Sequence, residues 1–310
     1  MCPLCAPPPP PPSHLLPPTS ASLATFSFAV GVSARAAAEI AAGAAELFAK
    51  GMVVRTEGLS EGQVARCYEA LTARFEDAMR RVKALDLDDA LLGGGFDAIK
   101  LRHHGRYDVT VPEFTERPFR FTRDAAPWMG LVRAALGADA KLVHCGCMLS
   151  LPDSSVQPWH SDGDHLSETR HFSPHCVNVF VPLVELTSNN GPTEFVPGSH
   201  VNGKWKGAAH SVTPCVPAGS YLVFDYRLRH RGLANHSSQP RPLLYLTYAK
   251  PFFADATNFS ATRYPELPEV AEWQGRDERS RKREQLSEKE RRRPSAASPK
   301  AALPPGSDEQ

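Results

Sequence analysis

The sequence lacks several features that would define whole classes of protein. None of its uninterrupted apolar runs approaches the 18 or more residues of a membrane-spanning helix, which argues against an integral membrane protein. Lys and Arg total 35 against 34 Asp and Glu, so the net charge is only +1 and gives no global attraction for nucleic acid or an anionic membrane. Seven cysteines in 310 residues indicate reduced thiols rather than a disulfide framework.

Acidic residues are also missing from the first 38 positions, where proline is abundant. The first 22 residues carry nine prolines, which prevents a helix or sheet interior. We expect residues 1–35 to form a disordered leader, with a transit peptide as the alternative. Residues 275–310 hold ten basic and seven acidic side chains, and we expect a charged, disordered tail over 259–310. The compartment stays open, with the cytoplasm favoured and organelle import as the alternative.

Between these tails the sequence predicts one domain over residues 36–258. A helix is predicted over 36–50, then a short strand over 52–54. Ser60 and Gln63 form a capping box that starts a second helix. Its apolar residues at helical spacing, Tyr68 among them, are predicted to lie in the core. A third helix is predicted from Asp124 to Gly137. Strand-like runs follow over 142–151, 176–184, 220–226 and 243–250, so the order of elements predicts an α+β fold with a β-sandwich or jelly-roll core.

Histidine is concentrated in the strand-rich half, where nine of the 12 fall between positions 144 and 236, and such clustering indicates a metal site. In the motif Trp-His-Ser-Asp-Gly at 159–163, an extended backbone would point His160 and Asp162 to the same side, toward one ion. His230, expected at the end of the 220–226 strand, is the predicted third ligand. Two His and one carboxylate leave three positions of an octahedral ion open, as in non-haem Fe(II) oxygenases.

A 2-oxo acid co-substrate on such an ion also needs its far carboxylate held, and Arg241 is the predicted anchor. It follows His230 by eleven residues, and a turn over 232–240 would place the two on adjacent strands. A guanidinium grips a carboxylate with two charge-assisted hydrogen bonds, and an inward arginine without one would be a costly unpaired charge. Strand alternation puts Tyr245 and Thr247 on the same face, so we expect both to line this pocket.

Taken together, these motifs resemble the phytanoyl-CoA dioxygenase family. The likeness comprises the motif at 159–163, the run Asn-Gly-Pro-Thr-Glu-Phe-Val-Pro-Gly-Ser-His at 190–200, and His230-Arg-Gly followed by Arg241, within roughly 45–248. The resemblance implies a double-stranded β-helix (jelly-roll, cupin-like) core with flanking N-terminal helices. It implies Fe(II) bound by His160, Asp162 and His230, 2-oxoglutarate bound by Arg241, dioxygen as co-substrate, and ascorbate as a supporting reductant. Halogenating relatives have a small residue in place of the acid, so Asp162 favours hydroxylation.

Further residues are expected around this centre. Asn178 and Thr247 are candidates for additional contacts with 2-oxoglutarate, with Lys100 as a third. Trp159 and Phe195 either wall the substrate cavity or pack the barrel. His200 is expected to lock a loop by hydrogen bonding rather than to bind the metal.

The resemblance therefore implies a dioxygenase that hydroxylates a C–H bond of a small-molecule or acyl substrate while converting 2-oxoglutarate to succinate and CO2. No nucleic-acid or membrane partner is expected. One alternative is a zinc-dependent metallohydrolase, for which Asp164 and His165 would be competing ligands. The other is a non-catalytic jelly-roll interaction module whose tails recruit partners. Substrate identity and oligomeric state are not predicted.

Overall fold

The computed structural model describes residues 33–123, 125–167, 169–201, 207, 210–255 and 258. The predicted leader up to residue 32, the predicted tail over 259–310 and the helix cap expected at Asp124 lie outside these residues. Across the described segments, the helices are all too short or too polar to cross a bilayer.

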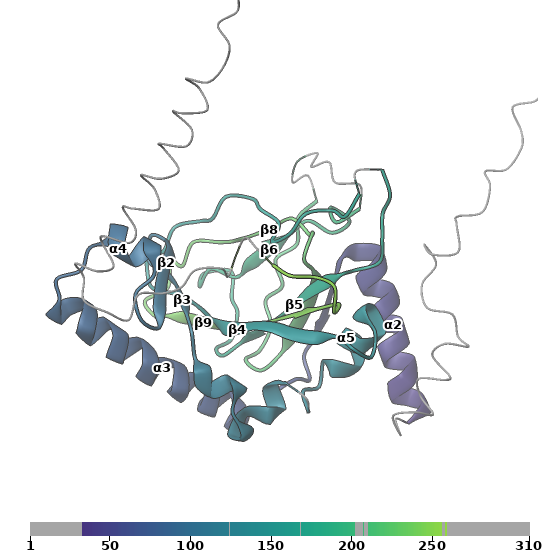
Figure 1. Ribbon diagram of the computed structural model, residues 1–310, viewed down its shortest axis with the longest axis horizontal. Helices are drawn as coiled ribbons and strands as arrows, with labels where there is room; N and C mark the ends of the chain where they lie inside the picture. Colours follow the sequence, from purple (N-terminus) through teal and green to yellow (C-terminus); the bar gives the residue numbers. More distant parts are fainter. Residues whose placement is uncertain are drawn as a thin grey trace, which may run out of the picture. The chain divides into compact units, whose positions relative to one another are not determined.

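Helices and strands are arranged as an α+β fold with two antiparallel sheets (Figure 1). The larger sheet has the strand order β1-β7-β5-β9-β4-β3-β2, and β6 pairs with β8 in a second sheet. The helices are α2 (Ala34–Lys50), α3 (Glu61–Ala84), α4 (Asp89–Gly94) and α5 (Met129–Leu136), with 3-10 turns η2 (Pro112–Thr115) and η3 (Arg117–Thr122). The strands are β1 (Met52–Arg55), β2 (Ile99–His103), β3 (Arg106–Val109), β4 (Lys141–Ser150), β5 (Cys176–Pro182), β6 (Thr193–Phe195), β7 (Tyr221–Asp225), β8 (His230–Gly232) and β9 (Arg241–Ala249).

The helices begin where local sequence signals allow. The Ser60 hydroxyl accepts a hydrogen bond from the Gln63 amide while the Gln63 side chain accepts one from the Ser60 amide, which confirms the predicted capping box of α3. Tyr68 of this helix is 37% exposed, so its predicted core position is wrong. Helix α5 begins at Met129, not near position 124, because Pro127 disfavours helical geometry in the residue before it.

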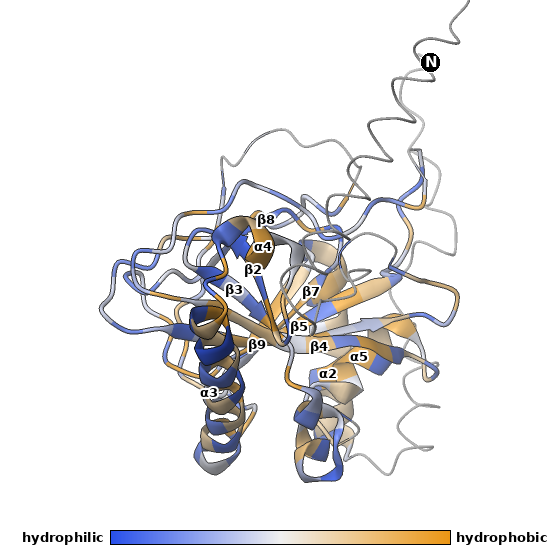
Figure 2. Ribbon diagram, turned by 60° about the vertical axis from the view of Figure 1, so that its left-hand side comes forward, coloured by the Kyte–Doolittle hydropathy of each residue, from blue (hydrophilic) through white to orange (hydrophobic). Residues whose placement is uncertain are grey.

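The two faces of the large sheet have different roles. On β5 and β9 one set of alternate residues packs into the core shared with the helices, namely Val177, Val179, Val181, Leu244, Leu246 and Tyr248. The other set, which includes Asn178, Phe180, Tyr245 and Thr247, lines a cavity. In both ribbon views α2 and α3 lie on one side of the sheet and β8 on the other, and the neighbouring strands β5 and β7 are mostly apolar (Figure 2). The sheet therefore separates a helix-covered core from the cavity.

Two predictions about the strands around His230 are wrong. Strand β7 ends at Asp225, and His230 begins the separate strand β8. The break follows from a buried turn in which the Asp225 carboxylate accepts hydrogen bonds from the Arg227 backbone amide, Nε and Nη2. Strand β8 pairs with β6, whereas β9 lies between β5 and β4, so His230 and Arg241 are not on adjacent strands.

Candidate metal and anion site

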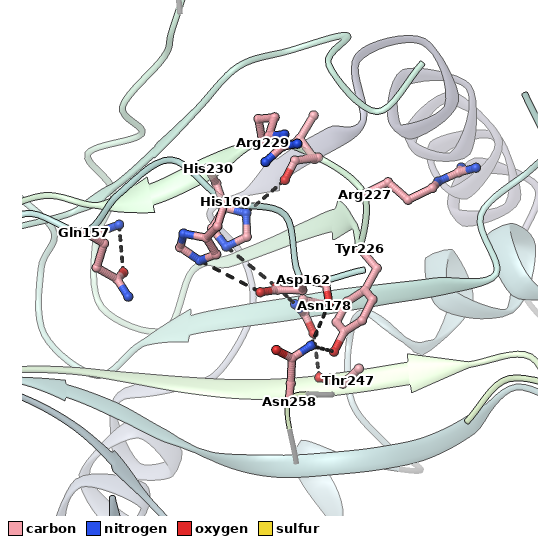
Figure 3. Close-up of polar contacts among 12 residues, drawn as sticks. Gln157, His160, Asp162, Asn178, Tyr226, Arg227, Arg229, His230, Thr247 and Asn258 are labelled. Atoms are coloured by element: carbon pink, nitrogen blue, oxygen red, sulfur yellow. Dashed lines mark hydrogen bonds and ion pairs between the residues drawn. The ribbon is translucent and has the colours of Figure 1, made fainter. Parts of the chain in front are cut away.

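Three side chains that are distant in sequence converge in the structure: His160, Asp162 and His230 each offer one ligand atom, and these atoms lie within 4.8 Å of one another. His230 Nε2 is 3.6 Å from Asp162 Oδ2, and His160 Nε2 is 3.9 Å from Asp162 Oδ1. Figure 3 shows the two imidazole rings beside each other and both facing Asp162. The grouping is the His-Asp-His set that the sequence motifs predicted, and its mixed N and O donors suit a divalent transition metal.

Backbone hydrogen bonds hold these residues together. His160 and His230 form an isolated antiparallel bridge in which the amide of each donates to the carbonyl of the other, at 3.0 and 2.9 Å. The amides of Asp162 and Gly163 both donate to the Tyr226 carbonyl, at 3.0 Å each. A Cβ on Gly163 would lie 2.5 Å from the Tyr226 ring, so glycine is needed for this close approach.

Both histidines are held in the orientation that a metal requires. Nδ1 of His160 donates to the Pro158 carbonyl and Nδ1 of His230 donates to the Leu228 carbonyl, each at 2.9 Å. With the proton on Nδ1, the lone pair of Nε2 faces the shared centre. Burial lowers the pKa of His230, which keeps its ring in the neutral form that binds metals. These features fit a bound divalent cation.

The carboxylate is oriented by a chain of polar groups from the sheet. Asn178 Nδ2 donates to Asp162 Oδ2 at 2.6 Å, and the Thr247 hydroxyl donates to Asn178 Oδ1 at 2.5 Å. Asn178 and Thr247 are direct partners across β5 and β9. Asn258 Nδ2 donates to the main-chain oxygen of Asp162 at 2.6 Å and to the Tyr226 hydroxyl at 3.1 Å (Figure 3). The Asp162 side chain is thereby fixed in one position.

Arg241 is buried at the rim of the same centre and has no acidic partner among the described residues. Its Nη2 donates to the Ser150 hydroxyl at 2.9 Å and to the Gly191 carbonyl at 2.7 Å, whereas Nε and Nη1 have no hydrogen-bond partner. Burial, and next the nearby Arg106, lower the pKa of Arg241 to about 9, which leaves it charged at neutral pH. A buried guanidinium with unused donors fits an anionic ligand.

One cavity of about 340 Å³ connects the three potential metal ligands with Arg241. Asn178, Tyr245 and Thr247 line it, as the sequence predicted for Tyr245 and Thr247. A second cavity of about 470 Å³ shares three lining residues with the first, Arg102, Tyr245 and Asn258. The two cavities therefore adjoin at these three residues.

Other predicted residues lie elsewhere. Phe195 is fully buried and stacks on the His230 ring at 5.8 Å, outside the cavity lining, so it packs the barrel. Trp159 is also absent from that lining. The Arg231 guanidinium lies over its ring, with Cζ 4.4 Å from the ring centroid. Lys100 lines the second cavity and not the first.

The structure also locates His200 and the alternative ligands. His200 Nε2 donates to the Phe48 carbonyl at 3.0 Å, which ties the loop after β6 to α2 as predicted. The alternative ligands Asp164 and His165 are not part of the cluster of ligand atoms.

Sequence reasoning missed several residues of the site. Arg106, on strand β3, and Gln157 line the cavity, and Ser150 links Arg106 with Arg241. Asn258 contacts Asp162 from the end of the described chain. None of these residues lies in a recognisable motif, and only the pairing of β3 with β4 brings Arg106 to the site.

Comparison with known proteins identifies the family. Residues 49–243 match the phytanoyl-CoA dioxygenase (PhyH) family, which is more than half of the chain. The chain belongs to the phytanoyl-CoA dioxygenase family, as the motifs indicated.

Two curated relatives are named as dioxygenases. The chain is 27% identical to dioxygenase af480 of Aspergillus fumigatus over 148 residues, which is 46% of this chain and 48% of that protein. It is 39% identical to dioxygenase aneA of Aspergillus aculeatus over 69 residues, 20% of this chain and 22% of that protein. The chain thus spans less than half the length of either relative.

Solved structures show the same fold. EctD from S. alaskensis in its apoform superposes with a TM-score of 0.52 and 22% identity, covering 76% of this chain and 86% of that chain. EctD with 2-oxoglutarate and 5-hydroxyectoine gives a TM-score of 0.51 at 21% identity, with the same coverage of 76% and 86%. At this identity the likeness concerns the fold alone, and it confirms the predicted α+β architecture with a jelly-roll core.

Proposed function

We propose that this protein is an Fe(II)- and 2-oxoglutarate-dependent dioxygenase that hydroxylates a C–H bond of a small organic or acyl substrate. The observation that carries the proposal is that one cavity holds both the cluster of His160, Asp162 and His230 and the unneutralised guanidinium of Arg241. Membership of the phytanoyl-CoA dioxygenase family and the two relatives named dioxygenases support it.

In this proposal each group of the site has a separate task. His160, Asp162 and His230 bind iron on one side and leave its other side to ligands from the cavity. Arg241 binds the distal carboxylate of 2-oxoglutarate with a donor that has no partner in the protein, Nε or Nη1. Asn178 and Thr247 hold the Asp162 carboxylate toward the metal. The chemistry supplied by bound iron and 2-oxoglutarate is dioxygen activation coupled to decarboxylation of the co-substrate to succinate and CO2.

The buried arginine favours this function over the alternatives. A zinc hydrolase needs a metal-bound water but no anion anchor in the same cavity, and a scaffold needs neither. Burying a charge without a partner is costly, so Arg241 is best explained by an anion that binds there.

We assign the substrate to the second cavity, next to the metal-facing one. Its lining includes Arg74, Lys100 and Arg102 as well as Asp97 and Asp108, so it presents charges of both signs. Arg102, Tyr245 and Asn258 border both cavities, and a substrate held there would point toward the metal centre. A polar small molecule or an acyl derivative fits this lining better than a purely apolar compound.

The proposal is tested by succinate formation from 2-oxoglutarate with Fe(II), dioxygen and ascorbate. We expect turnover by the full-length protein even without substrate, and its loss in His160→Ala and Asp162→Ala. His236→Ala is the matched control, because His236 is an exposed histidine outside the cavity and should retain turnover. Turnover that survives both ligand substitutions would refute the function.

A further inference from the structure

The cavity contains a second buried arginine beside Arg241. Arg106 is directly opposite Ser150 in the pairing of β3 with β4, and Ser150 is directly opposite Arg241 in the pairing of β4 with β9. The three side chains therefore form one row across three neighbouring strands and project to the same face of the sheet. Arg106 and Arg241 are each 1% exposed, and both line the cavity.

Both guanidinium groups converge on the same hydroxyl. Arg106 Nη1 donates to Ser150 Oγ at 2.5 Å and Arg241 Nη2 donates to it at 2.9 Å. These two bonds use both lone pairs of the oxygen, so the hydroxyl proton of Ser150 remains to be donated to an acceptor. Nε of Arg106 and Nε and Nη1 of Arg241 are buried without a hydrogen-bond partner. Both guanidinium groups therefore retain unused donors, and Ser150 retains its proton.

The positive charge of this row is not compensated by the protein. Neither Arg106 nor Arg241 forms an ion pair with any residue that the structure describes. Arg102, which also lines the cavity, differs because its Nη2 lies 2.9 Å from Asp108 Oδ2. Two like charges buried side by side repel each other, and such a pair is stable when an anion lies between them.

A purely structural role explains only part of Arg106. Its Nη2 donates to the carbonyls of Ser155 and Leu233, at 3.3 and 2.9 Å, and so links two loops. A neutral amide could supply such hydrogen bonds without burying a charge next to Arg241. The charge itself therefore needs an explanation that these contacts do not give.

We propose that Arg106 is a second co-substrate-binding residue, and that the distal carboxylate of 2-oxoglutarate lies between Arg106 and Arg241 and accepts the proton of Ser150. The inference rests on the proposed function, since it names further residues for the same co-substrate. Its consequence is strong preference for a 2-oxo acid with a second carboxylate, because an uncharged tail would leave both guanidinium groups unpaired.

The test compares two ligands in matched variants. 2-Oxopentanoate has the same five-carbon chain as 2-oxoglutarate but ends in a methyl group instead of the distal carboxylate. Dissociation constants of both are measured by calorimetry for the full-length protein loaded with Mn(II). The dissociation constant of 2-oxopentanoate divided by that of 2-oxoglutarate isolates the contribution of the distal carboxylate. A general disturbance of the site would not change this ratio.

We expect Arg106→Gln and Arg241→Gln each to lower this ratio by about 10-fold or more, with 2-oxopentanoate binding nearly unchanged. Arg231→Gln is the matched control, because Arg231 pairs with Glu194 outside the cavity lining, and it should keep the wild-type ratio. A wild-type ratio in Arg106→Gln, or equal weakening of both ligands, would overturn the inference.

Two further results keep the outcomes distinct. If Arg106→Gln does not fold, Arg106→Lys is measured instead, because lysine keeps the charge but lacks the planar guanidinium. We expect Arg106→Lys to lower the ratio by about threefold or more. An unchanged ratio in Arg106→Lys overturns the inference. If the wild-type protein with Mn(II) binds neither ligand, the proposed function fails as well. Normal 2-oxoglutarate binding with no effect of Arg106 refutes the inference alone.

Discussion

The main chains of His160 and His230 exchange two hydrogen bonds, so these two potential metal ligands are fixed side by side by the backbone. Their rings are 4.4 Å apart between centroids, and each is turned by a hydrogen bond from Nδ1 to a carbonyl two residues earlier in the chain. The protein's own hydrogen bonds therefore orient both nitrogen ligands. The carboxylate of Asp162 is held separately, by a hydrogen bond from Asn178 on strand β5.

The support of Asp162 by Asn178 gives the first prediction. Asn178→Ala removes the amide that fixes Asp162 Oδ2, and we expect Mn(II) binding to weaken by about 10- to 100-fold. Thr247→Val removes only the bond that orients Asn178 and should have a smaller effect. Calorimetric titration with Mn(II) measures both. Asn189→Ala, an exposed position, serves as the control, and metal affinity in Asn178→Ala equal to that of the control would show that this contact is unimportant.

A second prediction concerns the stability of α3. Ser60→Ala removes the capping hydroxyl, and we expect the free energy of unfolding to fall by about 0.5–2 kcal/mol in urea denaturation. Gly62→Ala, in the same helical turn, should act in the opposite direction by roughly 0.5 kcal/mol, because a Cβ there meets no atom within 4 Å. If both substitutions changed the free energy of unfolding in the same direction, the capping geometry would be contradicted.

A third prediction concerns pH and His175. This histidine is buried, with neither ring nitrogen hydrogen-bonded, and burial followed by repulsion from Arg227 lowers its pKa from 6.5 to about 4. Between pH 6.5 and 4 the unfolded chain therefore binds a proton that the folded protein does not bind. The contribution to stability is full above pH 6.5 and is lost as the pH falls through this range, by at most about 1.4 kcal/mol per pH unit.

The variant His175→Phe removes this titration and keeps an aromatic ring against Phe253, whose centroid lies 4.8 Å away. We expect its free energy of unfolding to fall less steeply with acid than that of the wild type. Denaturation at pH 7, 6, 5 and 4 measures the difference in slope. If the free energies of unfolding of the two proteins changed with pH in parallel, His175 would be protonated equally in the folded and unfolded states.

Much of the site could be predicted because its main residues lie in short motifs. His160 and Asp162 are two residues apart, so extended backbone alone places them on one side. Arg241 could be assigned from its position at the start of an apolar strand and the cost of burying its charge. Gly191, in the 190–200 motif, has a φ of +73°, which glycine adopts readily, and its carbonyl accepts a hydrogen bond from Arg241.

The rest depended on contacts that sequence spacing does not encode. Arg106 belongs to a hairpin of short strands with bulged pairing, and no periodic pattern marks it. Sequence spacing does not reveal the break before His230, because the buried Asp225–Arg227 ion pair at the end of β7 is a contact of the folded protein. The sequence could not show whether Phe195 lines the cavity or packs in the core, because core and cavity positions alternate along such strands.

The most direct test of the account is an anaerobic titration of the full-length protein with Fe(II) and 2-oxoglutarate, followed by visible absorption. A 2-oxo acid that chelates Fe(II) through its carboxylate and keto oxygen gives a charge-transfer band. We predict this band for the wild type, its loss in His160→Ala, and a need for higher 2-oxoglutarate concentrations in Arg241→Gln. No band in the wild type at saturating concentrations, or an unchanged band in His160→Ala, would contradict the assignment of the site.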